Sequence, residues 1–272
     1  MSSQDLGRLA KTPAANVVID ADLVHRLLQN QHSDLAHLEI APVDAGWDNV
    51  TDRLGDRLAI RLPRRQAAAA LVEHEQAWLP NLAGHLPIAV PTPCRLGTPA
   101  LHYPWRWSIL PWLNGTPTDL EPPHPSQAQR WGEFLRALHI PAPPNAPANP
   151  FRGVPLKQKN DAIAERLHRL AVKTDLITPT VATLWETALT APIDTPATWL
   201  HGDLHSRNIL VENGVITGVI DWGDMTSGDI ATDLASLWML FEDAVARQEA
   251  VTAYGGVSET TLQRARGWAI FF

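Results

Sequence analysis

Two aspartates, an asparagine and two histidines lie close together in the sequence, and their side chains suit the chemistry of a bound cation. They occur in His201-Gly-Asp-Leu-His-Ser-Arg-Asn208 and at Asp221. Carboxylate and amide oxygens are the hard donors that hold Mg²⁺, with water and phosphate oxygens completing its coordination. The spacing His201-x-Asp203-x-His205 also suits Zn or Fe. That alternative leaves Asn208 and Asp221 without a role, so the residue types favour a hard divalent ion.

A β-hairpin is predicted between these residues. Asn213-Gly214 lies between apolar, β-branched runs, which is a strong hairpin signal because both central residues of a type I′ turn need positive φ. Glu212 then pairs with Val215. The pairing runs back along both strands to Ser206 opposite Asp221.

This register determines how close the polar side chains come. Asn208 lies one diagonal step from Asp221, which separates their side chains by roughly 7–8 Å or less. Asp203 lies in the loop that enters the hairpin. The turn chemistry therefore gathers three polar side chains in one cleft, where a single divalent ion can bridge Asn208 and Asp221.

The composition describes a folded protein with one large domain or two lobes. The chain has 272 residues, 45% hydrophobic and 19% charged. Its net charge of −7 argues against nucleic acid as a partner, and the basic run Arg61–Arg65 is too short to change this. A single cysteine, Cys94, excludes an internal disulfide and fits a reducing cytosol. The N-terminus lacks signal-peptide features and no run of about 18 apolar residues occurs, so we expect a cytoplasmic protein without a membrane span.

The first part of the chain predicts an antiparallel three-strand meander. Tight turns at Asp44–Trp47 and Gly55-Asp56 join its strands, which excludes the βαβ unit of a dinucleotide-binding domain. The predicted strands are 37–43, 48–54, 57–62 and 105–112, with helices over 20–31 and 66–79, the second ended by Pro80. We place a lobe boundary near residue 113.

The second part predicts mainly helices. Ser126 and Gln129 form a capping-box pattern at the start of one of them. The predicted helices begin near 126, 157, 179, 232 and 258, and a proline-rich linker spans 141–155. The last helix still runs at Phe272, which suggests that a C-terminal segment is missing.

This order of elements resembles the aminoglycoside phosphotransferase family, which is related to choline kinases and distantly to protein kinases. The glycine-bearing turn, third strand, helix and connector are followed by HxDxxxxN at His201–Asn208 and IDxG at Ile220–Gly223. The resemblance covers about residues 35–270. It implies an α+β, two-lobe, protein-kinase-like fold, with an antiparallel-sheet N-lobe over 1–113 and a mainly helical C-lobe over 114–272.

The resemblance also implies roles for the motif. Asp203 matches the catalytic aspartate, which orients the acceptor hydroxyl and accepts its proton. Asn208 and Asp221 match the ligands of Mg²⁺. His201 matches a position that braces the loop, whereas His205 lies either behind the site or near the phosphates.

In the N-lobe the resemblance implies a nucleotide site. Gly46 and Asn49 belong to the loop that covers the phosphates, and Arg61 stands where the family usually has lysine. Glu75 matches its partner carboxylate, with Glu73 as the alternative. Arginine is a planar fork and lysine a point charge, yet arginine can also bind phosphate oxygens and a carboxylate. The alternative is that Arg61 is an edge-strand residue whose charged group simply snorkels to solvent, without a functional role.

The connector over 108–113 is expected to contact the nucleobase. Leu110, Trp112 and Leu113 are the residues assigned to this contact. Further along, Asp229 and Asp233 match a family pattern and are expected to cap a helix and brace the loop of Asp203.

The implied function is a small-molecule kinase that transfers the γ-phosphoryl group of ATP or GTP to a hydroxyl of a small acceptor. An aminoglycoside-like or other antibiotic is the expected acceptor, which would make the protein an antibiotic-resistance enzyme. The carboxylates expected to attract a cationic acceptor are Asp119, Glu121, Asp224 and Glu242. Two alternatives are a housekeeping kinase of a sugar or amino alcohol, and a nucleotide-binding protein with little catalysis.

Overall fold

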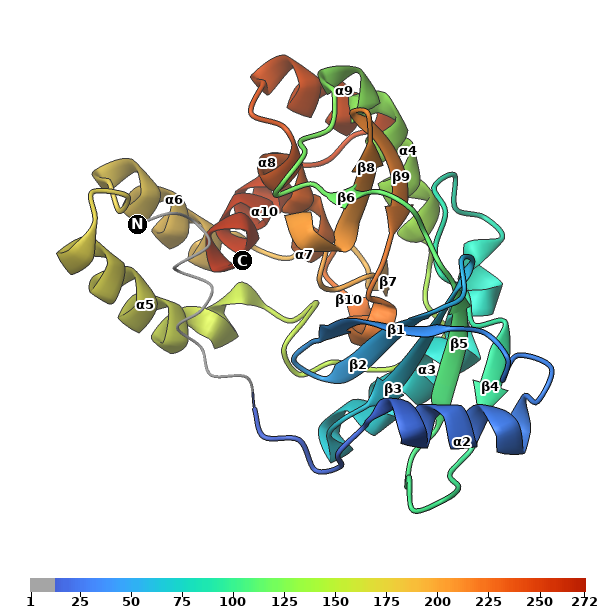
Figure 1. Ribbon diagram of the computed structural model, residues 1–272. Helices are drawn as coiled ribbons and strands as arrows, with labels where there is room; N and C mark the ends of the chain where they lie inside the picture. Colours follow the sequence, from blue (N-terminus) through green and yellow to red (C-terminus); the bar gives the residue numbers. More distant parts are fainter. Residues whose placement is uncertain (1–12) are drawn as a thin grey trace. The chain divides into compact units, whose positions relative to one another are not determined.

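The computed structural model describes residues 13–272 (Figure 1). Residues 1–12, on which part of the predicted N-lobe and the signal-peptide prediction fall, lie outside the described residues. The chain divides into two compact units. The N-terminal unit runs to Pro80 and continues over Pro91–Trp112, whereas the C-terminal unit comprises Asn81–Val90 and Leu113–Phe272.

The N-terminal unit is built on a five-stranded antiparallel sheet. Its strand order is β1-β2-β3-β5-β4, so β3 lies in the centre. The predicted meander is confirmed, because β2 pairs with both β1 and β3. The strands are β1 (Ile40–Ala45), β2 (Asn49–Leu54), β3 (Leu58–Pro63), β4 (Arg95–Gly97) and β5 (Trp107–Pro111).

Two helices belong largely to this unit. Helix α2 (Ala21–Gln31) is capped by Asp20, whose side chain accepts a hydrogen bond from the Leu23 amide at 2.8 Å. Its apolar face joins the core of the sheet. Helix α3 (Gln66–Ala83) does not stop at Pro80 as predicted, because a proline in the last turn removes little of the helical hydrogen bonding.

The C-terminal unit contains two small antiparallel sheets. One pairs β7 (Thr198–Leu200) with β10 (Thr226–Gly228), and the other has the order β6-β8-β9. Strands β8 (Ile209–Glu212) and β9 (Val215–Val219) form the predicted hairpin around Asn213-Gly214, where both residues have positive φ. Strand β6 (Thr116–Pro117) lies on its edge.

Helices make up most of the remaining C-terminal unit (Figure 1). They are α4 (Ala128–Leu138), α5 (Asn160–Lys173), α6 (Pro179–Thr190), α7 (Ala231–Leu234), α8 (Ser236–Leu240), α9 (Ala244–Tyr254) and α10 (Glu259–Phe271). The helix predicted to begin near 232 does not continue as a single helix, because Phe241 is extended and Asp243 caps a new helix through the Val245 amide at 2.9 Å. The predicted capping box at Ser126 is also wrong, since that residue lies in a 3-10 turn before α4.

A buried arginine of α10 ties distant parts of this unit together. Arg264 is 1% exposed and donates to both carboxylate oxygens of Asp229, at 2.8 and 3.0 Å. It also donates to the carbonyl of Pro192 and to Asp194. Such a network of charge-assisted bonds fixes α10 against the segment that follows β10.

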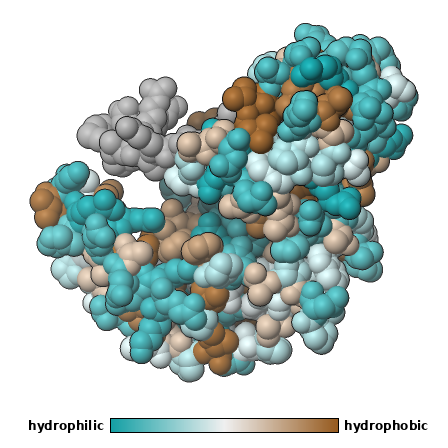
Figure 2. Space-filling model, turned by 90° about the horizontal axis from the view of Figure 1, so that it is seen from below, coloured by the Kyte–Doolittle hydropathy of each residue, from teal (hydrophilic) through white to brown (hydrophobic). Residues whose placement is uncertain are grey.

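One face of the molecule has the mixed polar and apolar surface of an ordinary folded protein. The face in Figure 2 is mostly hydrophilic, with hydrophobic side chains in small separate groups. Over residues 13–272, no helix is both long and apolar enough to cross a lipid bilayer.

Candidate active site

The loop after β7 is held by a buried aspartate of α7. Asp233 is fully buried and accepts hydrogen bonds from the backbone amides of His201 at 2.7 Å and Gly202 at 2.9 Å. His139 lies 3.4 Å from the same carboxylate. Gly202 has φ +86°, and a Cβ there would lie 2.6 Å from the carbonyl oxygen of Asp224. The backbone that leads to Asp203 is therefore fixed, as expected of Asp233.

His201 braces this loop through both ring nitrogens. Its Nε2 lies 3.0 Å from the carbonyl of Ile220, and its Nδ1 accepts from the Asp203 amide at 3.2 Å. A carbonyl cannot donate, so Nε2 carries the proton and Nδ1 accepts. Neither nitrogen can then ligate a metal, which removes a ligand from the alternative transition-metal site. The bracing role expected of His201 matches this geometry.

Asp203 lies at the centre of a polar cluster, with 15% of its side chain exposed. Its Oδ1 accepts from Arg152 at 2.6 Å, and its Oδ2 lies 3.4 Å from His205 and from the Asn208 amide. Burial raises the pKa of Asp203. The hydrogen bond with His205 and the positive charge of Arg152 lower that pKa, and together with the neighbouring histidines they outweigh burial, so the pKa lies below its ordinary value. The carboxylate is therefore ionised and able to accept a proton from an oriented hydroxyl.

Asn208 is oriented by its own amide group. Its Nδ2 donates to the backbone carbonyl of Asp203 at 2.9 Å, which leaves the hard oxygen Oδ1 for another partner. The residue is 6% exposed and ends a 3-10 turn, Ser206–Asn208, directly before β8. Its backbone carbonyl accepts from the Ile220 amide at 2.9 Å. Asn208 is thus tied to the residue just before Asp221.

The hairpin register differs from the prediction below its tip. Glu212 faces Val215 as predicted, but the pairing shifts by one residue between Leu210 and Val211. Ile209 therefore faces Val219, and the predicted regular pairing back to Ser206 is wrong. A β-bulge of this kind adds a residue on one strand and turns the strand ends, which the turn alone cannot specify.

Asp221 has an unusual backbone. Its φ of 62° and ψ of 64° lie in the left-handed region, which is sparsely populated by residues other than glycine and is common at functional sites. The following Trp222 is buried, donates to the Val219 carbonyl at 3.0 Å, and packs its ring 4.6 Å from His201. The packed turn that follows Asp221 therefore fixes the backbone of Asp221, from which its exposed side chain extends.

These donors fit Mg²⁺ better than a transition metal. Asn208 and Asp221 offer one amide oxygen and one carboxylate, and Mg²⁺ commonly uses few protein ligands together with water and phosphate. Among the residues the structure describes, no group of three or more histidine, cysteine, aspartate or glutamate side chains is arranged to hold a metal.

Arg152 belongs to this cluster although no sequence motif pointed to it. It lies in the proline-rich segment 141–155, and its guanidinium reaches both Asp203 and, through Nε at 3.7 Å, Asp224. Asn149 donates to Asp224 at 2.7 Å. Burial and the negative charge of Asp203 raise the pKa of Asp224, while Arg152 and Asn149 lower it. Nothing in the local sequence indicates this contact, because it depends on how the linker folds back.

Most of the carboxylates expected to attract a cationic acceptor already have partners in the chain. Asp119 lies 3.2 Å from Arg207, and Glu121 accepts from the Gly214 amide at 2.9 Å. Asp224 pairs with Arg152. Glu242 is exposed.

In the N-terminal unit, Arg61 and Glu75 form the predicted pair. Arg61 Nη1 donates to Glu75 Oε2 at 2.7 Å, and both side chains are buried. With its oxygen turned to the guanidinium, Asn49 accepts from Nη2 at 2.9 Å and Nε at 3.2 Å. Glu73, the alternative partner, lies 3.9 Å from Arg106 on the surface. Because Arg61 is buried on the central strand β3, the edge-residue alternative is wrong.

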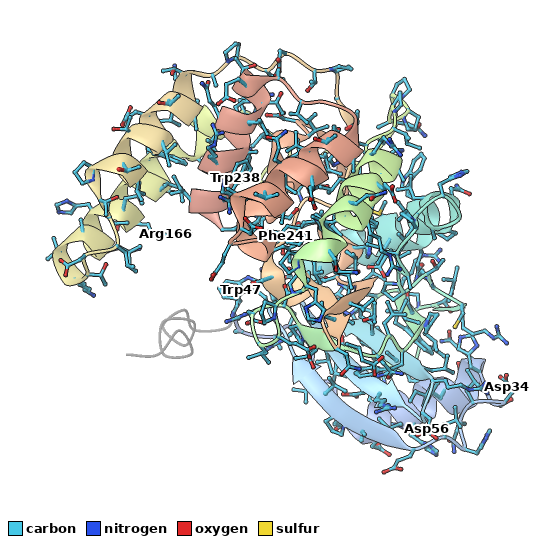
Figure 3. All side chains as sticks on the ribbon, turned by 90° about the horizontal axis from the view of Figure 1, so that it is seen from above. Asp34, Trp47, Asp56, Arg166, Trp238 and Phe241 are labelled. Carbon is cyan, nitrogen blue, oxygen red and sulfur yellow. The ribbon has the colours of Figure 1, made fainter. Side chains whose placement is uncertain are left out.

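The other predicted nucleotide residues lie in both units. Gly46 accepts from Arg64 at 3.1 Å, beside the exposed Trp47 in the turn between β1 and β2 (Figure 3). Leu110 is buried in β5, and the Trp112 ring lies 5.0 Å from the Arg53 guanidinium. Leu113 belongs to the C-terminal unit, together with Asp203, Asn208 and Asp221.

The sequence resembles known proteins over most of its length. Residues 39–268 match the profile of the phosphotransferase enzyme family. The uncharacterized protein YcbJ of Bacillus subtilis (strain 168) is 27% identical over 235 residues, which cover 77% of this chain and 72% of that protein.

Solved structures share the fold. Wild-type aminoglycoside 2′-phosphotransferase-IIIa in complex with GDP has a TM-score of 0.68 at 17% identity and covers 92% of this chain and 88% of its own. Macrolide 2′-phosphotransferase MphH from Brachybacterium faecium has a TM-score of 0.60 at 22% identity, covering 93% and 88%. The ternary complex of APH(2″)-IIa with streptomycin and ATP has a TM-score of 0.61 at 18% identity, covering 94% and 90%. The predicted α+β, kinase-like fold is thereby confirmed.

Proposed function

This chain belongs to the phosphotransferase enzyme family and is a phosphotransferase acting on a hydroxyl group, and we propose that it transfers the γ-phosphoryl group of ATP or GTP to a small acceptor. The observation that carries this proposal is the position of Asp203. Its side chain is mostly buried, it follows a loop that Asp233 fixes, and its backbone carbonyl is held by Asn208. Phosphoryl transfer needs little covalent help beyond such positioning and charge neutralisation.

Each residue of the motif has a separate role in this proposal. Asp203 orients the acceptor hydroxyl and accepts its proton as the phosphoryl group moves. Asn208 and Asp221 hold Mg²⁺, which, when bound, neutralises charge on the phosphate oxygens. His201 and Asp233 keep the loop in place.

Arg61 is proposed to contact the phosphates of the donor. Its pairing with Glu75 supports this role, because a buried guanidinium held by a carboxylate is oriented for other acceptors. Asn49 holds the opposite edge of the guanidinium. The backbone of Leu110, Trp112 and Leu113 is proposed to contact the nucleobase.

The remaining part of the proposal concerns the identity of the donor nucleotide and of the acceptor. The neighbouring structures were solved with GDP and with ATP, so either nucleotide is a candidate donor. Aminoglycosides and macrolides, named for those enzymes, are the first acceptors to test, and such activity would make this an antibiotic-resistance enzyme. A sugar or amino alcohol is the alternative acceptor. We place the protein in the cytoplasm, where these donors are abundant.

Nucleotide turnover with a panel of hydroxylated compounds tests the proposal. ATP and GTP consumption are measured with aminoglycosides, macrolides, sugars and amino alcohols, with and without Mg²⁺. Asp203→Ala should lower kcat by roughly 10²–10⁴-fold, the range of general acid–base catalysis. The matched control is Asp175→Ala, which removes an exposed carboxylate of the same unit. Undiminished turnover in Asp203→Ala would refute the catalytic assignment. Nucleotide binding without turnover for every acceptor would favour a binding protein.

A further inference from the structure

Arg152 makes the shortest contact to the proposed catalytic aspartate. Its Nη2 lies 2.6 Å from Asp203 Oδ1, which is the length of a strong charge-assisted hydrogen bond. The side chain is 18% exposed, so water screens this contact little. Its Nε faces Asp224 at 3.7 Å. One guanidinium thus bridges two carboxylates through separate N–H groups in a rigid planar fork, a geometry that the compact ammonium of lysine does not reproduce.

The backbone that carries Arg152 is fixed, unlike that of a surface arginine. On one side, the Asn149 side-chain oxygen accepts a hydrogen bond from the Phe151 amide at 2.8 Å, and the Asn149 backbone amide donates to the Thr226 hydroxyl at 2.9 Å. On the other side, the Gly153 carbonyl accepts from the Asp229 amide at 3.0 Å. The segment is therefore joined to β10 and to the residue that Arg264 holds.

Close packing leaves little room for this segment to move. Gly153 has φ +66°, and a Cβ there would lie 2.8 Å from the side chain of Leu200 in β7. Aromatic rings also limit the guanidinium, which lies 5.5 Å from the ring centre of Phe271 and 5.2 Å from that of Phe272. Cation–π contacts of this length hold an arginine in place. Arg166 lies on α5 (Figure 3). Its guanidinium donates to the backbone carbonyl of Phe271 at 2.8 Å and so holds that residue.

The charges around Asp203 indicate that Arg152 offsets the repulsion between two carboxylates. The carboxylates of Asp203 and Asp224 contact the same guanidinium, and the negative charge of Asp203 raises the pKa of Asp224. Without a cation between them, their repulsion would turn the Asp203 side chain away from its present position. His205 and Asn208 contact only the other oxygen, Oδ2. Arg152 alone holds Oδ1 among the described residues.

We propose that Arg152 is a positioning residue for phosphoryl transfer: it holds the carboxylate of Asp203 in one fixed orientation relative to the acceptor hydroxyl. This inference rests on the proposed function. Arg152 acts through Asp203 and does not itself take part in bond making. A misplacement of about 1 Å at a reacting group costs roughly 10²-fold in rate, so the effect should appear in kcat.

Kinetics of three variants test the inference. Arg152→Gln should lower kcat about 10²-fold while the KM for the nucleotide stays within about twofold, since only the acceptor side is disturbed. Arg152→Lys should recover part of the loss, because an ammonium group restores the positive charge beside Asp203 but not the rigid planar geometry of the guanidinium. Arg169→Gln is the matched control, since that arginine is exposed on α5 and its ion pair is with Glu165, one turn away on the same helix. Wild-type kcat in Arg152→Gln, or no rescue by lysine, would overturn the proposal.

A structural readout separates this inference from the proposed function. Crystal structures of Arg152→Gln and Arg169→Gln show whether Asp203 keeps its side-chain position, whatever acceptor the enzyme uses. We expect Asp203 to rotate or become disordered only in Arg152→Gln. An unmoved Asp203 in that variant overturns the inference even if the enzyme is an active kinase. A moved Asp203 supports it even if none of the tested acceptors is phosphorylated.

Discussion

Replacing Asp233 tests how strongly the catalytic loop depends on one buried carboxylate. Its two oxygens accept two backbone amides, from His201 at 2.7 Å and Gly202 at 2.9 Å. Asp233→Ala leaves both buried donors without a partner. Each costs about 1–3 kcal/mol, so the free energy of unfolding should fall by roughly 2–6 kcal/mol. Because the same amides lead to Asp203, kcat should fall as well.

Asp233→Asn refines this prediction. An asparagine keeps one oxygen, so it serves one of the two amides while its own NH₂ group faces the other donor. We expect a loss of about 1–3 kcal/mol, smaller than that of alanine. Urea unfolding followed by tryptophan fluorescence measures the free energy, with Asp175→Ala as the exposed control. An alanine variant that loses less than about 1 kcal/mol, or an asparagine variant equal to the wild type, would refute the reasoning.

Three further predictions concern the backbone, a buried tyrosine and the nucleotide site. Gly202→Ala should cost about 1–3 kcal/mol of stability from its positive φ alone, and more from its contact with Asp224, as urea unfolding will show. Burial and the charge of Asp233 raise the pKa of Tyr254 to about 12, so the stability that its protonated form contributes is present below about pH 10 and is lost as pH rises toward 12. Tyr254→Phe should therefore flatten the fall of the urea midpoint between those pH values, and an unchanged fall would contradict this. Arg61→Ala should raise the KM for the nucleotide about tenfold or more, whereas Arg61→Lys should retain binding; equal KM values for both variants would contradict the phosphate contact.

Local signals in the sequence were enough to predict the hairpin and the meander. Asn213, Gly214 and Gly55 have the positive φ that their turns require, and such a preference is set by the local residue types. The Arg61–Glu75 pair was also predicted, but from family resemblance, since the spacing between a strand and a helix does not by itself bring two side chains together.

Features that depend on tertiary contacts were not predictable. The bulge after Leu210 arises where the hairpin meets its neighbours. The alternation of apolar and polar residues along a strand does not reveal where one extra residue is inserted. The break at Phe241 lies within an otherwise continuous helical pattern. Arg152 is the clearest case, because 51 positions separate it from Asp203 and the intervening segment has no regular pattern. A charge in a proline-rich linker is ordinarily solvated, so only the folded chain reveals its partner.

The Arg264 network has a consequence for how the protein is made. Asp229 lies buried in the segment that braces the site, and its counterion is on α10, which the ribosome synthesises after every other element of the described chain. An ionised carboxylate buried without its partner is strongly unfavourable. The segment that contains Asp229 therefore reaches its final packing only after α10 has emerged, and the nascent C-terminal unit remains exposed to chaperones and proteases until then.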